Sequence, residues 1–510
     1  MQRPQRLLST GRPVAPLRYV SRPGTGGSTG PIPCPTLAKR NRPLSSRDNR
    51  ESLMSDHRSL CRWIAALACA VACFLTGSLD AEDWPQWRGV DRAAVWHETG
   101  IVERFAEDGL IVKWRAPVRA GFAGPAVAGG RVFVPDYRET AGTRTMDGHE
   151  RLVALDEETG AVLWTREWPA TYRNIVPVFA TGPRATPTVD GDRVYVLGAA
   201  GMLSCFDTAT GDLIWQIDTV ADYDVTVPVY GVAHSPLVED DLLITLLGGE
   251  PDAMVVAFDK ATGTEAWRAL DTNAEAGYSS PIVTTAGGVR QLIVWHPAGV
   301  TSLDPATGRT WWEHDFPLAS GLTIGTPVRS GRYLLITQVE NGGLMLALNT
   351  DRPAARVVWT GANPNRTDRP VQRSMTSTPI VLGDEIYGLN SYGELRGVDA
   401  TTGERLWSSD RLVPQDRWAS SHLVQHGDRA FISVETGDLV IARFSPAGYE
   451  EIDRTHLLTP TTRTRGGGSG RWRHVDRPVL WAHPAYANRH VFARNDAEVV
   501  RLSLAAADYE

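Results

Sequence analysis

One short pattern recurs along the chain: an apolar run, Asp, Thr-Gly, a few residues and then Trp. The first full copy is Leu152-Val-Ala-Leu-Asp-Glu-Glu-Thr-Gly-Ala-Val-Leu-Trp164. Four more copies also place the Trp eight residues after the Asp, at Asp207–Trp215, Asp259–Trp267, Asp304–Trp312 and Asp399–Trp407. Two degenerate copies follow the same rhythm, Leu344 to Trp359 with Asn349 in place of Asp, and Leu439 to Ile452 with Ile in place of Trp. A period of 45 to 52 residues between these tryptophans indicates a repeat architecture.

The composition of the unit predicts a β-hairpin. Two runs rich in Val, Leu and Ile flank a short connection that ends in Gly, which suits a turn with positive φ. The Asp is expected to accept hydrogen bonds from the turn amides, and the Thr hydroxyl to do the same more weakly. Because both runs are almost continuously apolar, we expect both faces of the sheet to be covered. One Trp per sheet is then a docking wedge against the next sheet: Trp114, Trp164, Trp215, Trp267, Trp312, Trp359 and Trp407.

A second signature stands upstream of each unit, usually Ser or Thr, then Pro and apolar residues, as in Thr186-Pro-Thr-Val189 and Ser280-Pro-Ile-Val283. Four strands per repeat correspond to one propeller blade. The last repeat lacks its fourth strand, whereas residues 110–118 read as a fourth strand without its first three. The sequence therefore predicts an all-β fold over residues 110–510, an eight-bladed β-propeller of four-stranded antiparallel blades. The N-terminal strand 110–118 closes the ring and removes its open edge.

Three segments precede the repeats. Residues 1–53 are rich in Arg, Pro, Ser and Gly and predict a disordered leader, either untranslated because Met54 is the true start or a genuine extension. Residues 54–81 have the form of a secretory signal peptide, with basic residues before the apolar run 63–75. This predicts export to the periplasm or cell envelope, with lipidation at Cys73 as a weaker alternative. Residues 82–109 predict an N-terminal clasp, whose Asp83-Trp-Pro-Gln-Trp-Arg-Gly89 packs on the outside or one face of the ring, with Arg88 paired to an acidic group.

Charge and cysteine content exclude some functions. Residues 82–510 carry 40 Lys and Arg against 55 Asp and Glu, and this acidic balance argues against sequence-independent nucleic-acid binding. Cys205 is the only cysteine after the predicted cleavage site. A lone cysteine on a strand is more often a small hydrophobe than a nucleophile.

The repeat, Ala154-Leu-Asp-Glu-Glu-Thr-Gly160 followed by Trp164, resembles that of the quinoprotein, or pyrroloquinoline-quinone-like, β-propellers, over about residues 84–510. That resemblance implies either a calcium-dependent quinoprotein dehydrogenase or a cofactor-free relative similar to the outer-membrane assembly lipoprotein BamB. The enzymes carry a disulfide between adjacent cysteines and an acidic calcium set, and the sequence has no Cys-Cys pair and no acidic cluster assignable to that role. We therefore expect a non-catalytic secreted scaffold without cofactor or metal, and keep a dehydrogenase that uses pyrroloquinoline quinone (PQQ) and calcium as the alternative.

The loops between blades converge on one mouth of a propeller channel, and several of them carry arginine and aromatic residues. We expect the mouth to bind a protein partner or an anionic or carbohydrate ligand, because Arg matches planar oxyanions and aromatic rings offer stacking surfaces. Association with a membrane would come through partners. The alternative is that these arginines pair with Asp368, Asp416 and Asp476 on a solvated surface. The candidate ligand-binding residues are Arg184, Arg366, Arg369, Arg373, Arg417, Trp418, His422, Trp472, Arg473 and Trp481. His234, His422 and His483 are expected to be structural histidines.

Overall fold

The computed structural model of the protein divides into two compact units, residues 1–77 and 78–510. It describes residues 81–142, 146–176, 181–272, 274–340, 342–361, 374, 376–464, 466 and 475–510. All of these residues belong to the second unit. The expected leader and most of the expected signal peptide therefore lie outside the described residues. Within the described ranges, no helix is both long and apolar enough to cross a membrane.

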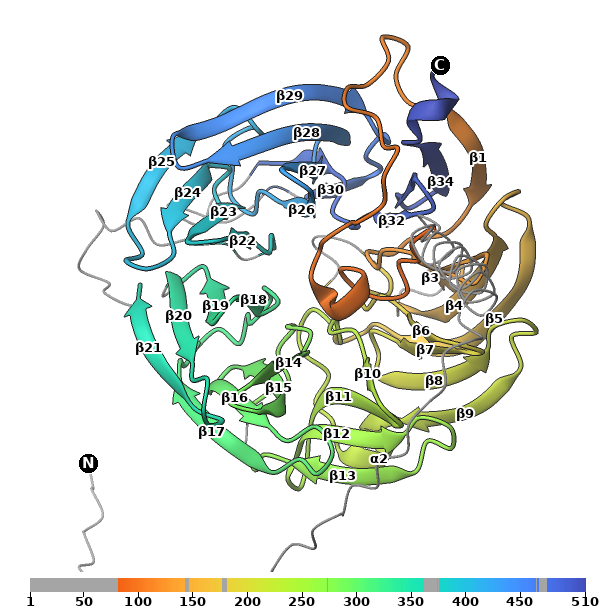
Figure 1. The fold of residues 1–510 in the computed structure, drawn as a ribbon. Helices are drawn as coiled ribbons and strands as arrows, with labels where there is room; N and C mark the ends of the chain where they lie inside the picture. Colours follow the sequence, from red (N-terminus) through yellow and green to blue (C-terminus); the bar gives the residue numbers. More distant parts are fainter. Residues whose placement is uncertain are drawn as a thin grey trace, which may run out of the picture. The chain divides into compact units, whose positions relative to one another are not determined.

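The described residues form eight four-stranded antiparallel sheets arranged as a ring (Figure 1). In blades 1 to 7 the strands pair in chain order, with the first strand nearest the centre. Blade 1 contains β2 (Ala126–Ala128), β3 (Arg131–Glu139), β4 (Asp147–Asp156) and β5 (Val162–Thr171). Blade 2 contains β6 (Thr188–Asp190), β7 (Arg193–Leu197), β8 (Met202–Asp207) and β9 (Leu213–Asp218). Blade 3 contains β10 (Leu237–Glu239), β11 (Leu242–Gly249), β12 (Ala253–Asp259) and β13 (Glu265–Ala269).

Blade 4 contains β14 (Ile282–Ala286), β15 (Val289–His296), β16 (Gly299–Leu303) and β17 (Thr310–Asp315). Blade 5 contains β18 (Val328–Ser330), β19 (Tyr333–Gln338), β20 (Gly342–Leu348) and β21 (Ala355–Thr360). Blade 6 contains β22 (Ile380–Leu382), β23 (Glu385–Leu389), β24 (Leu395–Asp399) and β25 (Arg405–Ser409). Blade 7 contains β26 (Ser421–His426), β27 (Arg429–Val434), β28 (Asp438–Ser445) and β29 (Gly448–His456). A two-stranded hairpin, β30 (Thr462–Thr464) and β31 (Arg477–Val479), follows blade 7.

Blade 8 closes the ring with strands from both ends of the described chain. Its inner strands are β32 (Ala485–Ala487), β33 (His490–Arg494) and β34 (Glu498–Ser503), and its outermost strand is β1 (Val112–Pro117). β1 pairs antiparallel with β34, with Arg115 opposite Val500. The prediction of eight blades closed by an N-terminal strand is thus confirmed. The remaining short helices are η1 (Val90–Arg92), α2 (Thr219–Tyr223) and η3 (Ala506–Asp508).

In the five repeats that have an Asp at the hairpin, the turn is built around that Asp. In blade 1, Asp156 Oδ1 accepts hydrogen bonds from the Thr159 amide at 2.9 Å and the Thr159 hydroxyl at 2.7 Å. These bonds, led by the one from the hydroxyl, lower the pKa of Asp156 because they stabilise its charged form. Gly160 follows with φ of 70°, a conformation that a side chain would strain. The turn chemistry expected from the sequence is confirmed.

The repeat tryptophans lie between consecutive blades. Trp164 donates from Nε1 to the carbonyl of Thr208 in blade 2, at 3.0 Å. A Cβ at Gly211 would lie 2.5 Å from the Trp164 ring, so glycine is required on that face. Equivalent bonds to the next blade are made by Trp114, Trp215, Trp267, Trp359 and Trp407. Trp312 differs because it donates to Gln291 of its own blade at 2.8 Å and is only partly buried.

The expectation that both faces of every strand are covered is wrong for the outermost strands. The two residues before the repeat Trp point to solvent, with Val162 54% exposed and Leu213 52% exposed. These strands form the rim of the ring, where only the side that carries the Trp faces another blade. Ile111, Val112, Leu163 and Ile214 are exposed in the same way.

The segment between residues 82 and 109 crosses one face of the ring to its centre (Figure 1). Trp84 pairs with Val127 of blade 1, and Val95 pairs with Gln425 of blade 7. The guanidinium of Arg92 is buried and donates to the carbonyls of Ser235, Pro236 and Pro281, in the inner segments of blades 3 and 4. The expected pairing of Arg88 with an acidic group is wrong. Arg88 donates to the carbonyls of Arg92 and Ala93, because the turn of its own segment buries the guanidinium among neutral acceptors.

Candidate functional site in the central channel

The Pro signature of each blade sets the lining of the central channel. The residue three positions before the Pro lines the cavity in seven blades, because the chain runs towards its inner strand with alternate side chains on the channel side. The members of this outer layer are Phe122, Arg184, Ala233, Tyr278, Ile324, Thr376 and Trp481. Residues directly before the Pro, such as Ser280, Thr326, Thr378 and His483, form an inner layer. We call the space within these layers the cup; it comprises two adjoining cavities of about 750 and 780 Å³.

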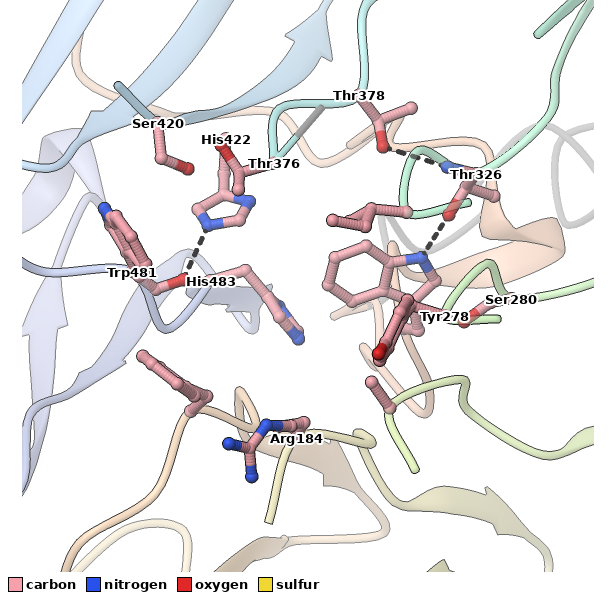
Figure 2. A pocket seen from close by; sticks show the side chains of 14 residues that line it. Arg184, Tyr278, Ser280, Thr326, Thr376, Thr378, Ser420, His422, Trp481 and His483 are labelled. Atoms are coloured by element: carbon pink, nitrogen blue, oxygen red, sulfur yellow. Dashed lines mark hydrogen bonds between the residues drawn. The ribbon is translucent and has the colours of Figure 1, made fainter. Parts of the chain in front are cut away.

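Hydroxyl groups of the signature join the blades around the cup. The Thr186 amide donates to Ser235 Oγ at 3.0 Å, and the Ser235 amide donates to Ser280 Oγ at 2.9 Å. The Thr326 amide donates to Thr378 Oγ1 at 3.3 Å (Figure 2). In these three pairs, one blade satisfies a buried main-chain donor of its neighbour, which explains why Ser or Thr precedes the Pro.

Trp87 of the N-terminal segment reaches into the cup. Its Nε1 donates to Thr326 Oγ1 at 2.8 Å, and its ring packs edge-on against His483, with centroids 4.3 Å apart. His422 lies 6.3 Å from the same ring. The segment that was expected to pack on the outside or on one face thus also contributes a side chain to the channel.

The histidines of the cup are neutral structural groups. His483 Nε2 lies 2.6 Å from Thr186 Oγ1, and His422 Nε2 lies 2.9 Å from the carbonyl oxygen of Trp481. Burial lowers the pKa of His483 to about 3 and that of His422 to about 4. Outside the cup, His234 is buried against Thr245, and burial lowers its pKa to about 3. All three environments suit uncharged imidazole.

Aromatic rings dominate the opposite end of the cup. Phe122 and Trp481 stack with centroids 6.1 Å apart, and Tyr230, Tyr278 and Trp418 line the same cavity. Trp418 has a positive φ of 68°, a strained conformation for a bulky residue. The guanidinium carbon of Arg417 lies 3.9 Å from the centroid of its ring.

A buried polar network holds Trp481 in place. Its Nε1 donates to Glu435 Oε2 at 2.9 Å, and Arg477 forms an ion pair with the same carboxylate at 3.0 Å. Burial raises the pKa of Glu435, although Arg477 and Trp481 oppose that shift. Arg477 also pairs with Asp416, so this part of the mouth is internally neutralised.

Four of the candidate ligand-binding residues line the cup: Arg184, Trp418, His422 and Trp481. Arg417 is buried beneath Trp418 and is not part of the lining. Arg366, Arg369, Arg373, Trp472 and Arg473 lie outside the described residues. The alternative pairing is seen for Asp416 with Arg477 and for Asp476 with Arg463, whereas Asp368 is not described. Arg184 is the single charged side chain among the described lining residues, and burial lowers its pKa.

The described lining does not fit a PQQ–calcium group. Calcium requires oxygen ligands and usually carboxylates, and no Asp or Glu is among the described residues that line the cup. Over the described ranges, no group of three or more His, Cys, Asp or Glu side chains is arranged to hold a metal ion. Cys205 is buried in β8, and burial raises the pKa of its thiol to about 11, which disfavours the reactive thiolate.

Sequence reasoning missed Trp87, Phe122, Tyr230, Tyr278, Ile324 and Thr376 as lining residues. The position three residues before each signature Pro would have identified four of them. Trp87 could be assigned only to the N-terminal clasp segment. Nothing in the local sequence indicates that it contacts Thr326, 239 residues away in sequence.

Comparison with known proteins places these features in a family. The family model described as outer membrane protein assembly factor BamB matches residues 97–177, 148–409 and 296–500. BamB of Burkholderia pseudomallei (strain K96243) is 23% identical over 273 residues, which cover 45% of this chain and 66% of that protein. The chain thus spans just under two thirds of that relative.

Solved structures share the fold. BamB from Moraxella catarrhalis has a TM-score of 0.50 at 14% identity, covering 77% of this chain and 99% of that one. A europium-containing methanol dehydrogenase has a TM-score of 0.54 at 12% identity, covering 74% of this chain and 86% of that one. At these identities the likeness concerns the fold alone, which hosts both enzymes and assembly factors.

Proposed function

Because the chain belongs to the PQQ-like β-propeller family described as outer membrane protein assembly factor BamB, we propose that it is a non-catalytic binding scaffold of the cell envelope. In this proposal the protein is exported and binds a partner protein at the aromatic end of the cup. Contact with a membrane comes through that partner.

The chemistry of the cup supports binding rather than catalysis. Its described lining combines aromatic and aliphatic side chains with Ser and Thr hydroxyls, and its histidines are neutral and hydrogen-bonded. No carboxylate that could take a proton is among the described lining residues. The hydroxyl that His483 contacts, Thr186, is fully buried, and burial lowers the pKa of His483 to about 3, which makes it a poor base. This absence of an accessible reactive pair among the described lining residues is the observation that carries the proposal.

The same lining favours a protein segment as the ligand. Trp and Tyr offer large rigid contact surfaces with little loss of rotamer freedom, which suits protein recognition. Arg184 lies with its guanidinium carbon 5.5 Å from the centroid of the Phe122 ring, where it can meet a carboxylate of the partner. A free anion or a carbohydrate is the other ligand class that Arg184 and the rings can serve.

The alternative function is that of a PQQ-dependent dehydrogenase. The 25% identity over 267 residues with a quinohemoprotein alcohol dehydrogenase of Pseudomonas putida favours it, but the described lining lacks the carboxylates that its calcium needs. We therefore rank it second and test it by direct cofactor titration.

Site-specific photocrosslinking in the producing cells tests the scaffold proposal. A photoreactive residue replaces Trp418 at the aromatic end of the cup, and the matched control replaces Leu213, which is exposed on the rim. We expect one discrete adduct from position 418, identified by mass spectrometry as an envelope protein, and none from position 213. No adduct at 418, or the same adducts at both positions, would contradict binding at the cup.

A further inference from the structure

A second cavity lies beside the N-terminal segment, between the innermost strands of blades 4 and 5. We call it the arginine groove; its volume is about 750 Å³. η1 contacts β14, and Figure 1 shows this segment beside β14 and β18 near the centre of the ring. The lining residues used below are Arg88, Asp91, Arg92, Thr284, Arg290 and Arg329.

Among the residues that the structure describes, three of the four arginines have no acidic partner. Arg88 and Arg92 donate to main-chain carbonyls, and Arg92 also donates to Gln86 Oε1 at 3.0 Å. Arg329 donates from Nε to Thr284 Oγ1 at 3.2 Å. Within the described part of the chain, none of the three forms an ion pair with a carboxylate. In contrast, Arg290 is held by both oxygens of Glu239.

The positive charge of the groove is poorly compensated. Burial lowers the pKa of Arg88 to about 10 and that of Arg92 to about 9, and it also lowers the pKa of Arg329. No nearby carboxylate opposes these shifts. Asp91 is the one carboxylate in the described lining, and it is exposed to solvent. The four arginines carry four positive charges, and Asp91 and Glu239 carry two negative ones, so the groove keeps a net charge of +2. This positive charge lies in a protein whose residues 82–510 are acidic overall.

Arg329 also has an unsatisfied donor. Its Nη1 is buried and has no hydrogen-bond partner among the described residues. A buried donor without a partner costs free energy comparable to a lost hydrogen bond, and a charged donor costs more. The Arg329 side chain as a whole is only partly buried, so a small rotation of the guanidinium would bring this donor to an anion in the groove, which would satisfy both the donor and the charge.

We propose that the arginine groove binds a phosphate or sulfate group, with Arg329 as the principal contact and Thr284 as the residue that positions it. The planar guanidinium fork matches two oxygens of such an anion. Arg88 and Arg92 contribute long-range charge, because both guanidinium groups already donate to main-chain carbonyls of the protein. The site lies against the N-terminal segment and shares none of these residues with the cup, so its existence does not depend on the proposed function.

Thermal unfolding of the full chain in sodium phosphate, against sodium chloride at equal ionic strength, tests the site. We expect phosphate to raise the melting temperature saturably by a few degrees, since a ligand that binds only the folded state stabilises it. In Arg329→Gln this rise should be lost, while the melting temperature in chloride stays equal or increases because an uncompensated buried charge has been removed. Arg329→Lys should fold and respond more weakly, since an ammonium group lacks the fork.

A matched variant locates the effect. Arg309→Gln removes an exposed arginine of blade 4 that stacks on Trp311, and it should keep the phosphate response. A parent protein that responds to phosphate no more than to chloride would overturn the proposal, and so would an unchanged response in Arg329→Gln.

A phosphate group can belong to a soluble molecule or to a lipid. Flotation with phosphatidylglycerol vesicles that is lost in Arg329→Gln would support the site and assign a lipid source. Absence of flotation together with a phosphate response that needs Arg329 would support the site and assign a soluble source.

Discussion

Trp164 Nε1 lies 3.0 Å from the carbonyl oxygen of Thr208 in the next blade. The same indole forms the surface on which Gly211 lies, so the Trp of one repeat and the turn of the next form a single joint. This joint explains why the Asp-Gly turn and the Trp recur together in the sequence, although the turn that a given Trp contacts belongs to the following repeat.

Substitution of Gly211 by Ala should destabilise the protein through this joint. The new Cβ would lie 2.5 Å from the Trp164 ring, and the alanine would have to adopt a backbone φ of 71°. We expect a loss of about 2 to 4 kcal/mol in unfolding free energy. Gly191→Ala in the same blade is the matched control, since its φ is 57° and nothing lies within 4 Å. Equal losses in chemical denaturation of the two variants would show that the indole contact is unimportant.

Removal of a joint tryptophan should cost more at Trp164 than at Trp312. Trp164→Ala deletes a side chain that is 7% exposed and should lower the unfolding free energy by about 3 to 5 kcal/mol. Trp312→Ala should cost less, because Trp312 is partly exposed and bonds within its own blade. Denaturation midpoints measure the difference, and a larger effect at Trp312 would contradict the assignment of the joints.

Ring closure should depend on β1. A truncated chain that starts at Arg119 loses β1 and exposes the edge of β34, so we expect it to lose cooperative unfolding and to aggregate. Circular dichroism and light scattering follow both effects. A control that starts at Leu110 removes the N-terminal segment and retains β1. Cooperative melting of the chain from Arg119 at the parent temperature would exclude a role for β1.

The buried histidines should make the protein sensitive to acid. Burial lowers the pKa of His483 to about 3, below the ordinary value of 6.5. A histidine with a lowered pKa stabilises the fold fully above pH 6.5, and this contribution is lost as the pH falls towards the pKa of the folded state. His483→Gln should flatten the dependence of unfolding free energy on pH between about 6 and 4.5 by about 1.4 kcal/mol per pH unit. The control is His97→Gln, whose side chain is 71% exposed. An unchanged slope in His483→Gln would mean that His483 is charged in the folded protein.

The fold could be predicted because its determinants are local and repeated. Five of the hairpin turns carry Asp and Gly at a fixed spacing. The unpaired strand 110–118 implied a partner in the last repeat, which lacks its fourth strand. The exposed Val162 and Leu213 were mispredicted because apolar composition cannot tell an outermost strand from a buried one. Trp87 and the carbonyl partners of Arg88 and Arg92 could not be predicted, since their contacts depend on how the ring closes around a non-repeated segment.

Part of the lining of the cup could be predicted for the same reason, whereas its role in binding stays a prediction. Arg184, Trp418, His422 and Trp481 line the cup because they stand at or near positions fixed by the repeat. Arg417 does not line it, because its guanidinium lies against Trp418. The sequence suggested a basic mouth, whereas the described lining is mainly aromatic, since charged side chains such as Arg477 are neutralised by Glu435 and Asp416.

Titration of the purified protein with PQQ and calcium tests the non-catalytic scaffold most directly. The cofactor's absorbance and the melting temperature of the protein are followed together. The scaffold proposal predicts no saturable change in absorbance and no cofactor-dependent rise in melting temperature at millimolar calcium. Saturable binding with a raised melting temperature that is lost in Arg184→Gln or Trp481→Ala would contradict the proposal and establish the cup as a quinone site.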